Sequence, residues 1–134
     1  MKTLYIVRHG ETDWNKMGKY QGITDIPLNE NGLNQAKACG NALKDVTFDR
    51  ILSSDLSRAL VTAETIRGDR TTSITVDKRL RELNFGDWEA MLFSDIESRW
   101  PGLIDEMYLR PHLVKVPNGE SFKDLPDRAW AGLE

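Results

Sequence analysis

The chain has 134 residues and a formal net charge of −3, which gives no general attraction to nucleic acid or to anionic membranes. Its length fits one domain over residues 1–134. The single cysteine, Cys39, excludes an internal disulfide, the N-terminus lacks a signal-like pattern, and no apolar run approaches the ~20 residues of a membrane span. We therefore expect a cytoplasmic protein that binds neither nucleic acid nor membrane.

The first elements along the chain predict a strand, a loop and a helix. Residues 4–7 form a continuous apolar run, typical of a strand buried on both faces of a parallel sheet. Residues 11–22 are polar and contain glycine, which indicates a loop. Residues 27–29 lead into a helix with one apolar face. That face carries Leu33, Ala36, Gly40 and Leu43.

The next elements repeat this order. Residues 49–53 predict a second strand, and Ser54 or Asp55 is the expected N-cap of the helix that follows. Residues 74–76 predict a third strand. Strands that alternate with helices indicate an α/β fold, and we expect three layers, α/β/α, around a mostly parallel sheet.

The remainder of the chain predicts two helices. Residues 94–97 have the spacing of a capping box and should open a helix that residues 101–102 stop. Pro126 lacks the N–H that a helix interior needs, so the final helix should begin near Asp124.

Arg8 and His9 follow the first predicted strand, at the position where ligands bind in open α/β sheets. A histidine acts as a nucleophile when one ring nitrogen is unprotonated and an acceptor holds the other. A histidine beside apolar residues is more often part of the core. The charged neighbour Arg8 favours the nucleophile here, and Gly10 permits a close approach of the backbone.

Arg58 falls in the first turn of the helix after the second strand, where free N–H groups and the helix dipole favour an anion. With Arg8 it would form a planar clamp with many donors for phosphate oxygens. The alternative is a surface ion pair of Arg58 with Asp55 or Glu64. The combination with His9 favours the clamp.

Glu82 comes just after the third strand, where a partly buried carboxyl could protonate a leaving alkoxide and later activate water. Glu11 is the second candidate for this role. The structural alternative is an ion pair of Glu82 with Arg79 or Arg81. The sequence leaves this choice open.

Weaker candidates lie in the predicted loop, where Asn15, Gln21 and Gly22 could donate to phosphate oxygens. The two histidines, His9 and His112, do not have the spacing of metal ligands, and the chain contains no glycine-rich phosphate loop. We expect a small phosphorylated substrate and neither a metal nor a cofactor.

Five sequence blocks occur together in one order. They are residues 4–12, 20–32, 53–63, 80–89 and 118–122. Through these blocks the chain resembles the histidine phosphatase superfamily, also called phosphoglycerate mutase-like. The resemblance implies the fold of that family, His9 as the phosphorylated nucleophile and Glu82 as the proton donor. It also implies that Arg8, Arg58, Asn15 and the Gly22 backbone bind phosphate.

The short segment between Trp88 and Gly119 is similar to that of the phosphatases in this family, including those that act on α-ribazole phosphate. Ala90 replaces a usual glycine. The block that holds the family's second active-site histidine is missing, and His112, in a predicted loop, is a poor substitute. We therefore expect a fold that is incomplete at the C-terminus, in a chain that is part of a longer protein.

Without that block the strand at residues 4–7 would expose an edge, which could pair with a second copy to give a homodimer. Three functions stay open. The first is hydrolysis of a small phosphomonoester through a phosphohistidine, and the second is a cofactor-dependent phosphoglycerate mutase. The third is a non-catalytic module that binds a phosphorylated ligand, because the arginine clamp is intact beside an incomplete catalytic set.

Overall fold

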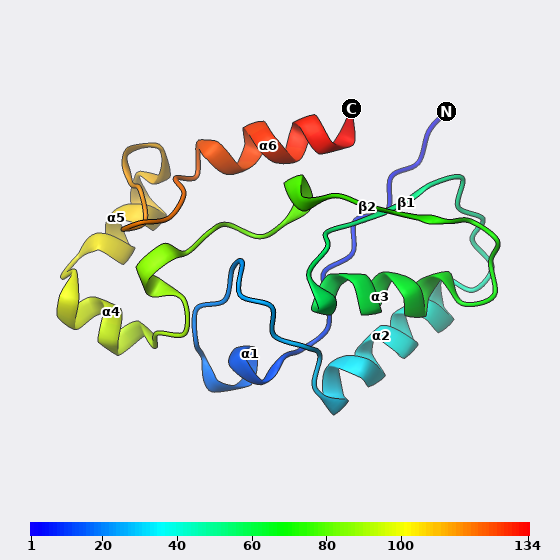
Figure 1. Cartoon of the computed structure of the whole chain (residues 1–134), viewed down its shortest axis with the longest axis horizontal. Coiled ribbons are helices and arrows are strands. Elements are labelled where there is room, and N and C mark those ends of the chain that lie inside the picture. The colour runs from blue at the N-terminus through cyan, green and yellow to red at the C-terminus, as the bar shows by residue number, and fades with distance from the viewer.

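Two short parallel strands form the sheet of this protein, which the computed structural model describes over all 134 residues (Figure 1). β1 (Ile51–Ser53) pairs with β2 (Ile74–Val76), and Ile51 lies opposite Ile74. α3 (Ser57–Arg67) joins the two strands and packs on both, and α2 (Glu30–Ala42) packs on α3. The α/β class predicted from the sequence is confirmed.

The other helices are shorter than α2 and α3. They are α1 (Asp13–Met17), α4 (Phe93–Arg99), α5 (Leu103–Leu109), α6 (Asp124–Leu133) and the 3-10 helices η1 (Lys78–Leu80), η2 (Gly86–Trp88) and η3 (Pro111–Leu113). α6 packs on η1, and in Figure 1 it lies on the opposite side of the sheet from α2 and α3. No helix is both long and apolar enough to cross a bilayer. α6 begins at Asp124, as predicted.

Residues 4–7 do not form the buried strand that their apolar run predicts. They make no strand hydrogen bonds, and Leu4 and Ile6 are 70% and 88% exposed. Tyr5 packs edge-on against Phe48, with ring centroids 5.7 Å apart. An apolar run is buried on two faces only where neighbouring strands and helices cover it, and these residues have no such neighbours.

α3 begins later along the chain than the sequence predicts, and a different residue caps it. α3 starts at Ser57, and neither predicted cap binds its first turn. The Asp55 carboxylate binds Arg81 at 2.6 Å, and the Ser54 hydroxyl accepts from the Leu56 N–H at 3.3 Å. The cap comes instead from Asp25, whose Oδ1 accepts from the Ser57 N–H at 2.9 Å and from its hydroxyl at 2.7 Å.

The predicted capping box at residues 94–97 does not form. α4 starts at Phe93, and its N-cap, Leu92, offers no side-chain hydrogen bond. Glu97 instead accepts from the Gly102 N–H at 2.9 Å, which ties the end of α4 to the following turn. The prediction of a capping box is therefore wrong, because the Glu97 carboxylate binds the N-cap residue of α5 and not the start of α4.

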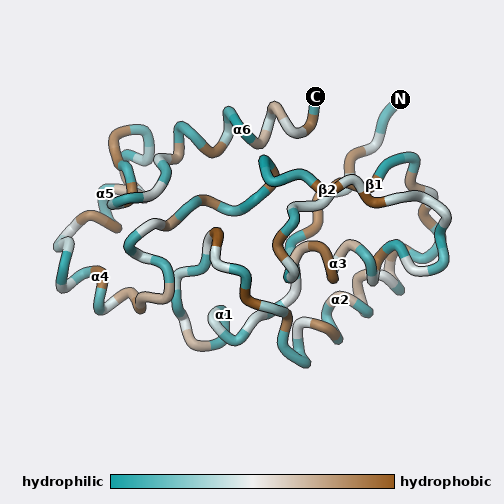
Figure 2. Tube along the Cα trace, viewed as in Figure 1, coloured by the Kyte–Doolittle hydropathy of each residue, from teal (hydrophilic) through white to brown (hydrophobic).

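The main group of buried apolar side chains lies outside the sheet, in the second half of the chain. It consists of Leu83, Trp88, Ile96, Ile104, Met107, Val114 and Val116. Tyr20 joins it from the first half, packing edge-on against Phe85 and Trp88 at centroid distances of 5.3 and 5.8 Å. Figure 2 shows hydrophobic residues in short stretches along both halves of the chain. The core thus holds the loop at residue 20 against residues 83–88.

Candidate active site

His9 lies at the end of the N-terminal segment and is half-buried. Its ring is hydrogen-bonded to the peptide group that follows it. The Nδ1 atom lies 2.6 Å from the Gly10 carbonyl oxygen. A carbonyl oxygen only accepts, so Nδ1 carries the proton and donates it. In the neutral ring Nε2 is then unprotonated, and its lone pair is free to attack an electrophile.

Close contact with α2 and α3 fixes the backbone after His9. The Gly10 N–H donates to the Thr62 hydroxyl at 3.3 Å, and the Glu11 N–H donates to Gln35 Oε1 at 2.9 Å. A Cβ on Gly10 would overlap the Gly32 carbonyl group, and a Cβ on Gly32 would overlap Glu11. The two glycines therefore let the segment that carries His9 lie directly on the first turn of α2.

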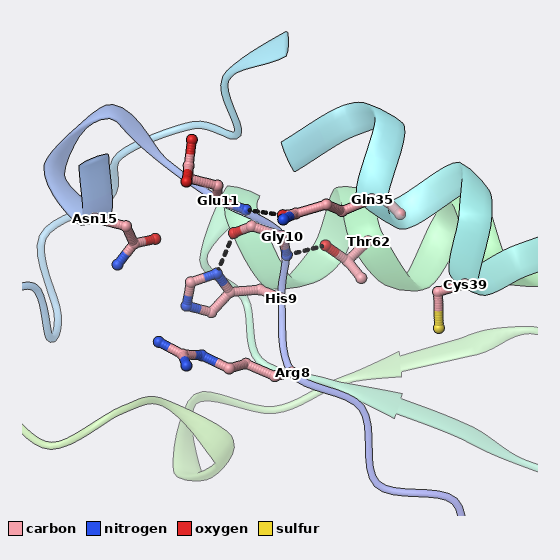
Figure 3. A pocket seen from close by; sticks show the side chains of 9 residues that line it. Arg8, His9, Gly10, Glu11, Asn15, Gln35, Cys39 and Thr62 are labelled. Carbon is pink, nitrogen blue, oxygen red and sulfur yellow. Dashed lines mark hydrogen bonds between the residues drawn. The ribbon is translucent and has the colours of Figure 1, made fainter. Parts of the chain in front are cut away.

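Beside His9 is an open cavity of about 360 Å³. Its lining residues are Arg8, His9, Gly10, Glu11, Asn15, Gln35, Ala36, Cys39 and Thr62. Figure 3 shows the side chains of Arg8 and His9 projecting to the same side, toward Asn15. The cavity thus brings together three of the residues predicted to hold phosphate or accept it.

Burial and charge both act on the imidazole. Burial lowers the pKa of His9 from its ordinary value, and the hydrogen bond to Gly10 partly opposes this effect. The positive charges of Arg58 and Arg8 lower the pKa of His9 further, while the Glu82 carboxylate raises it. The net lowering keeps the ring neutral at pH 7, the state in which Nε2 is a nucleophile.

Arg8→Gln should raise the pKa of His9, because it removes a positive charge that disfavours the imidazolium. A His112→Gln background leaves one imidazole, whose ring C–H resonances can be followed by NMR through a pH titration. The parent should titrate below 6.5, the ordinary value, and Arg8→Gln should titrate higher than the parent. Arg50→Gln, at another exposed arginine, is the control, and equal shifts in both variants would contradict this account of the site.

Arg58 is 2% exposed and does not form the surface ion pair that was the alternative. Its NH1 group donates to the Thr24 carbonyl at 2.8 Å, and its NH2 group donates to the Gly22 carbonyl. It does not line the cavity at His9, although its charge acts on that imidazole. A guanidinium has five N–H groups, so three of them stay free for a phosphate.

Glu82 is exposed, so the partial burial expected of a proton donor is missing. Its Oε1 accepts from the Leu83 N–H at 2.7 Å, and it does not pair with Arg79 or Arg81. Its charge acts on both His9 and Arg58, which places its carboxylate near the imidazole and the guanidinium. Glu11, the second candidate, does line the cavity, and its Oε1 accepts from the Asn29 side chain at 3.1 Å.

The three weaker candidates differ in what they can offer a ligand. Asn15 lines the cavity; its Oδ1 accepts from the Thr12 N–H at 3.0 Å, which leaves its amide N–H groups free. Gln21 is buried, and its Oε1 lies 2.6 Å from the Thr12 hydroxyl. The Gly22 N–H donates to Glu89 at 3.1 Å, so the protein itself already uses this donor.

Asn15 lies on a short helix that the sequence did not predict. α1 occupies part of the expected loop at residues 11–22 and begins at the N-cap Thr12, where Thr12 and Asn15 form a capping box. The Thr12-x-x-Asn15 spacing was the signal that could have found it.

His112 lies apart from the cavity in η3, and no three His, Cys, Asp or Glu side chains are grouped to bind a metal ion.

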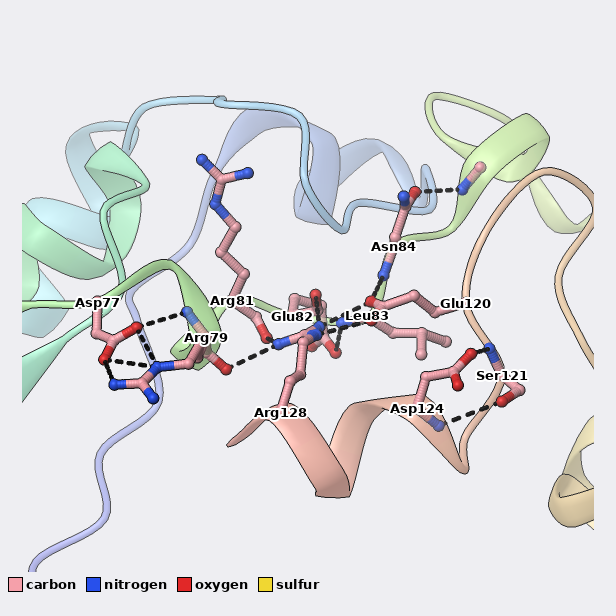
Figure 4. A network of polar contacts seen from close by, with 11 residues as sticks. Asp77, Arg79, Arg81, Glu82, Leu83, Asn84, Glu120, Ser121, Asp124 and Arg128 are labelled. Atoms are coloured by element: carbon pink, nitrogen blue, oxygen red, sulfur yellow. Dashed lines mark hydrogen bonds and ion pairs between the residues drawn. The ribbon is translucent and has the colours of Figure 1, made fainter. Parts of the chain in front are cut away.

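Arg128 on α6 holds the chain segment that carries Glu82 (Figure 4). Its guanidinium donates to the carbonyl oxygens of Arg79, Arg81 and Glu82 at 2.9, 2.7 and 2.7 Å. It also binds the Glu120 carboxylate at 2.7 Å, and the hydrogen bond from Arg128 lowers the pKa of Glu120. α6 therefore fixes the backbone on which the proposed proton donor stands.

Arg128→Ala should lower the free energy of unfolding by about 2 kcal/mol, because it leaves several partly buried acceptors without a donor. The pair with Glu120 is 22% and 21% exposed. The matched control is Arg110→Ala, whose i,i+4 partner Glu106 is 50% exposed and whose loss should cost less than about 0.5 kcal/mol. Urea unfolding of both variants compares them, and equal losses would contradict the role of Arg128.

The geometry defines a class of protein, an α/β fold that presents a neutral imidazole and a neighbouring guanidinium in one cavity. The sequence pattern of the histidine phosphatase superfamily (branch 1) matches residues 4–134. The chain belongs to this superfamily, and the resemblance noted from its five blocks is confirmed.

Known relatives match nearly the whole of this chain. The uncharacterized phosphatase PhoE of Bacillus subtilis is 40% identical over 133 residues, which are 99% of this chain and 63% of the relative. The probable phosphoglycerate mutase GpmB of Salmonella choleraesuis is 37% identical over 133 residues, 99% of this chain and 62% of the relative. The crystal structure of the alpha-ribazole phosphatase from Shigella flexneri has a TM-score of 0.85 and 32% identity, covering 95% of this chain and 63% of that one. The chain therefore spans less than two thirds of the length of these relatives.

Proposed function

We propose that this protein hydrolyses a small phosphomonoester through a phosphohistidine formed on Nε2 of His9. The observation that carries the proposal is the hydrogen bond from Nδ1 to the Gly10 carbonyl, which leaves Nε2 unprotonated beside Arg8. The lowered pKa of His9, caused first by burial, supplies the neutral ring at pH 7. The names of the relatives PhoE and α-ribazole phosphatase support a phosphatase reaction.

In the first step, Nε2 attacks the phosphorus, an N–P bond forms, and the bond from phosphorus to the ester oxygen breaks. The leaving alkoxide takes a proton from the carboxyl group of Glu82. The guanidinium groups of Arg8 and Arg58 and the Asn15 amide stabilise the charge on the phosphoryl oxygens. In the second step, water gives its proton to Glu82 and attacks phosphorus, which releases phosphate and regenerates neutral His9.

The similarity to GpmB favours a second candidate, a phosphoglycerate mutase. A mutase would pass the phosphoryl group from His9 to a second hydroxyl of a phosphorylated sugar acid instead of to water. Incubation with 3-phosphoglycerate separates the two reactions, because isomerisation supports the mutase and release of inorganic phosphate supports the phosphatase.

The experiment that tests the shared first step is brief exposure to a ³²P-labelled phosphomonoester, followed by denaturation. We expect label on the protein that is lost in acid and retained in base, and that maps to the peptide containing His9. A protein that binds orthovanadate but never acquires label would support the non-catalytic binding module instead.

A further inference from the structure

The loop at residues 22–24 is held between two side chains of opposite charge. On one side, Arg58 donates to the carbonyl oxygens of Gly22 and Thr24. On the other side, Oε1 of Glu89 accepts from the Gly22 N–H at 3.1 Å, the Thr24 N–H at 2.9 Å and the Thr24 hydroxyl at 2.7 Å. The loop therefore connects a buried guanidinium to a carboxylate through backbone hydrogen bonds on both sides.

Glu89 is itself fixed from the other direction. Its Oε2 accepts from the Phe85 N–H at 3.2 Å, so one carboxylate ties the loop to the turn that precedes η2. The packing leaves no spare room, because a Cβ on Gly22 would lie 2.6 Å from Glu89 Oε2 and would overlap the Leu83 carbonyl. The loop cannot shift relative to Glu89 without breaking several hydrogen bonds.

Charge gives a second reason for this arrangement. Burial lowers the pKa of Arg58, while the charges of Glu82, Glu89 and Asp25 raise it. A buried cation is costly unless opposite charge lies near it. Of these three carboxylates, Glu89 is the one that accepts hydrogen bonds from the loop at residues 22–24, to which Arg58 donates.

We propose that Glu89 is a positioning residue, which fixes the loop at residues 22–24 and thereby orients the guanidinium of Arg58 toward a bound phosphoryl group. Two N–H groups of Arg58 are used by this loop, and the direction of the three free ones follows from those two bonds. Glu89 does not touch the phosphate. The inference rests on the proposed phosphate site and adds to it the residue that sets its geometry.

Orthovanadate binding by the whole chain, measured by calorimetry, tests the proposal. Glu89→Gln removes the charge and places an amide N–H₂ among backbone donors, so it should weaken binding about tenfold or more. Thr24→Val removes one donor to Glu89 and leaves the carboxylate in place, and it should weaken binding by a smaller factor. Glu97→Gln is the matched control, because Glu97 also accepts a hydrogen bond from a backbone N–H but lies on α4. The affinity of this variant for vanadate should match that of the parent.

A double variant separates positioning from general stability. In an Arg58→Lys background, where the planar guanidinium is already lost, Glu89→Gln should weaken binding by less than about twofold. A Glu89→Gln protein that unfolds more easily but binds vanadate as the parent does would overturn the proposal, and Thr24→Val decides in the same way if Glu89→Gln does not fold. A parent that binds no vanadate would overturn the phosphate site itself, and the role of Glu89 with it.

Discussion

His9→Asn is expected to reduce phosphoryl capture by roughly 10³-fold or more, because it removes the imidazole that lines the cavity and forms the N–P bond. Asparagine is a close mimic of one half of the ring. Its amide nitrogen can occupy the place of Nδ1 and donate to the Gly10 carbonyl, which lies 2.6 Å from Nδ1 in the parent, but nothing replaces Nε2. The backbone of the site therefore stays as it is while the nucleophile disappears.

The measurement is the amount of acid-labile ³²P retained by the denatured protein after brief exposure to a labelled phosphomonoester. His112→Gln is the matched control, because it removes the other imidazole from an exposed position in η3 and should leave the label unchanged. Label that persists in His9→Asn, or that is lost equally in both variants, would refute the assignment of the nucleophile.

Gly32→Ala should lower the free energy of unfolding by about 3 kcal/mol, the upper part of the range for overpacked sites. A Cβ on Gly32 would lie 2.8 Å from the Glu11 nitrogen and would overlap the Glu11 carbonyl. Both obstacles are backbone atoms, which cannot rotate away as a side chain can. The segment that carries His9 would have to lift from α2, so phosphate binding should weaken together with stability.

Gly40→Ala is the same substitution on the same helix and serves as its control. Its Cβ would lie 3.1 Å from the Thr65 carbonyl oxygen, a contact that a small shift can relieve. Alanine also favours the helix by about 1 kcal/mol over glycine, so the net change should be close to zero. Urea unfolding of both variants checks the prediction, and similar midpoints for Gly32→Ala and the parent would show that the close contact is not required.

The sequence by itself determined the family and the residues worth testing. Arg8, His9 and Arg58 stand out because charged groups follow predicted strands and helix starts, and the five blocks connect them to one superfamily. β2 and the start of α6 were also predicted, because strand composition and the position of Pro126 are local signals.

Only the tertiary structure decided which side chains face one another. Residues 4–7 read as a buried strand but have no covering neighbours, and Asp55 read as a cap but is bound by Arg81 from a distant part of the chain. The same holds for Glu89, whose contact with Gly22 joins residues 67 positions apart. Local patterns report the preferences of neighbouring residues, whereas burial and charge pairing depend on segments that only folding brings together.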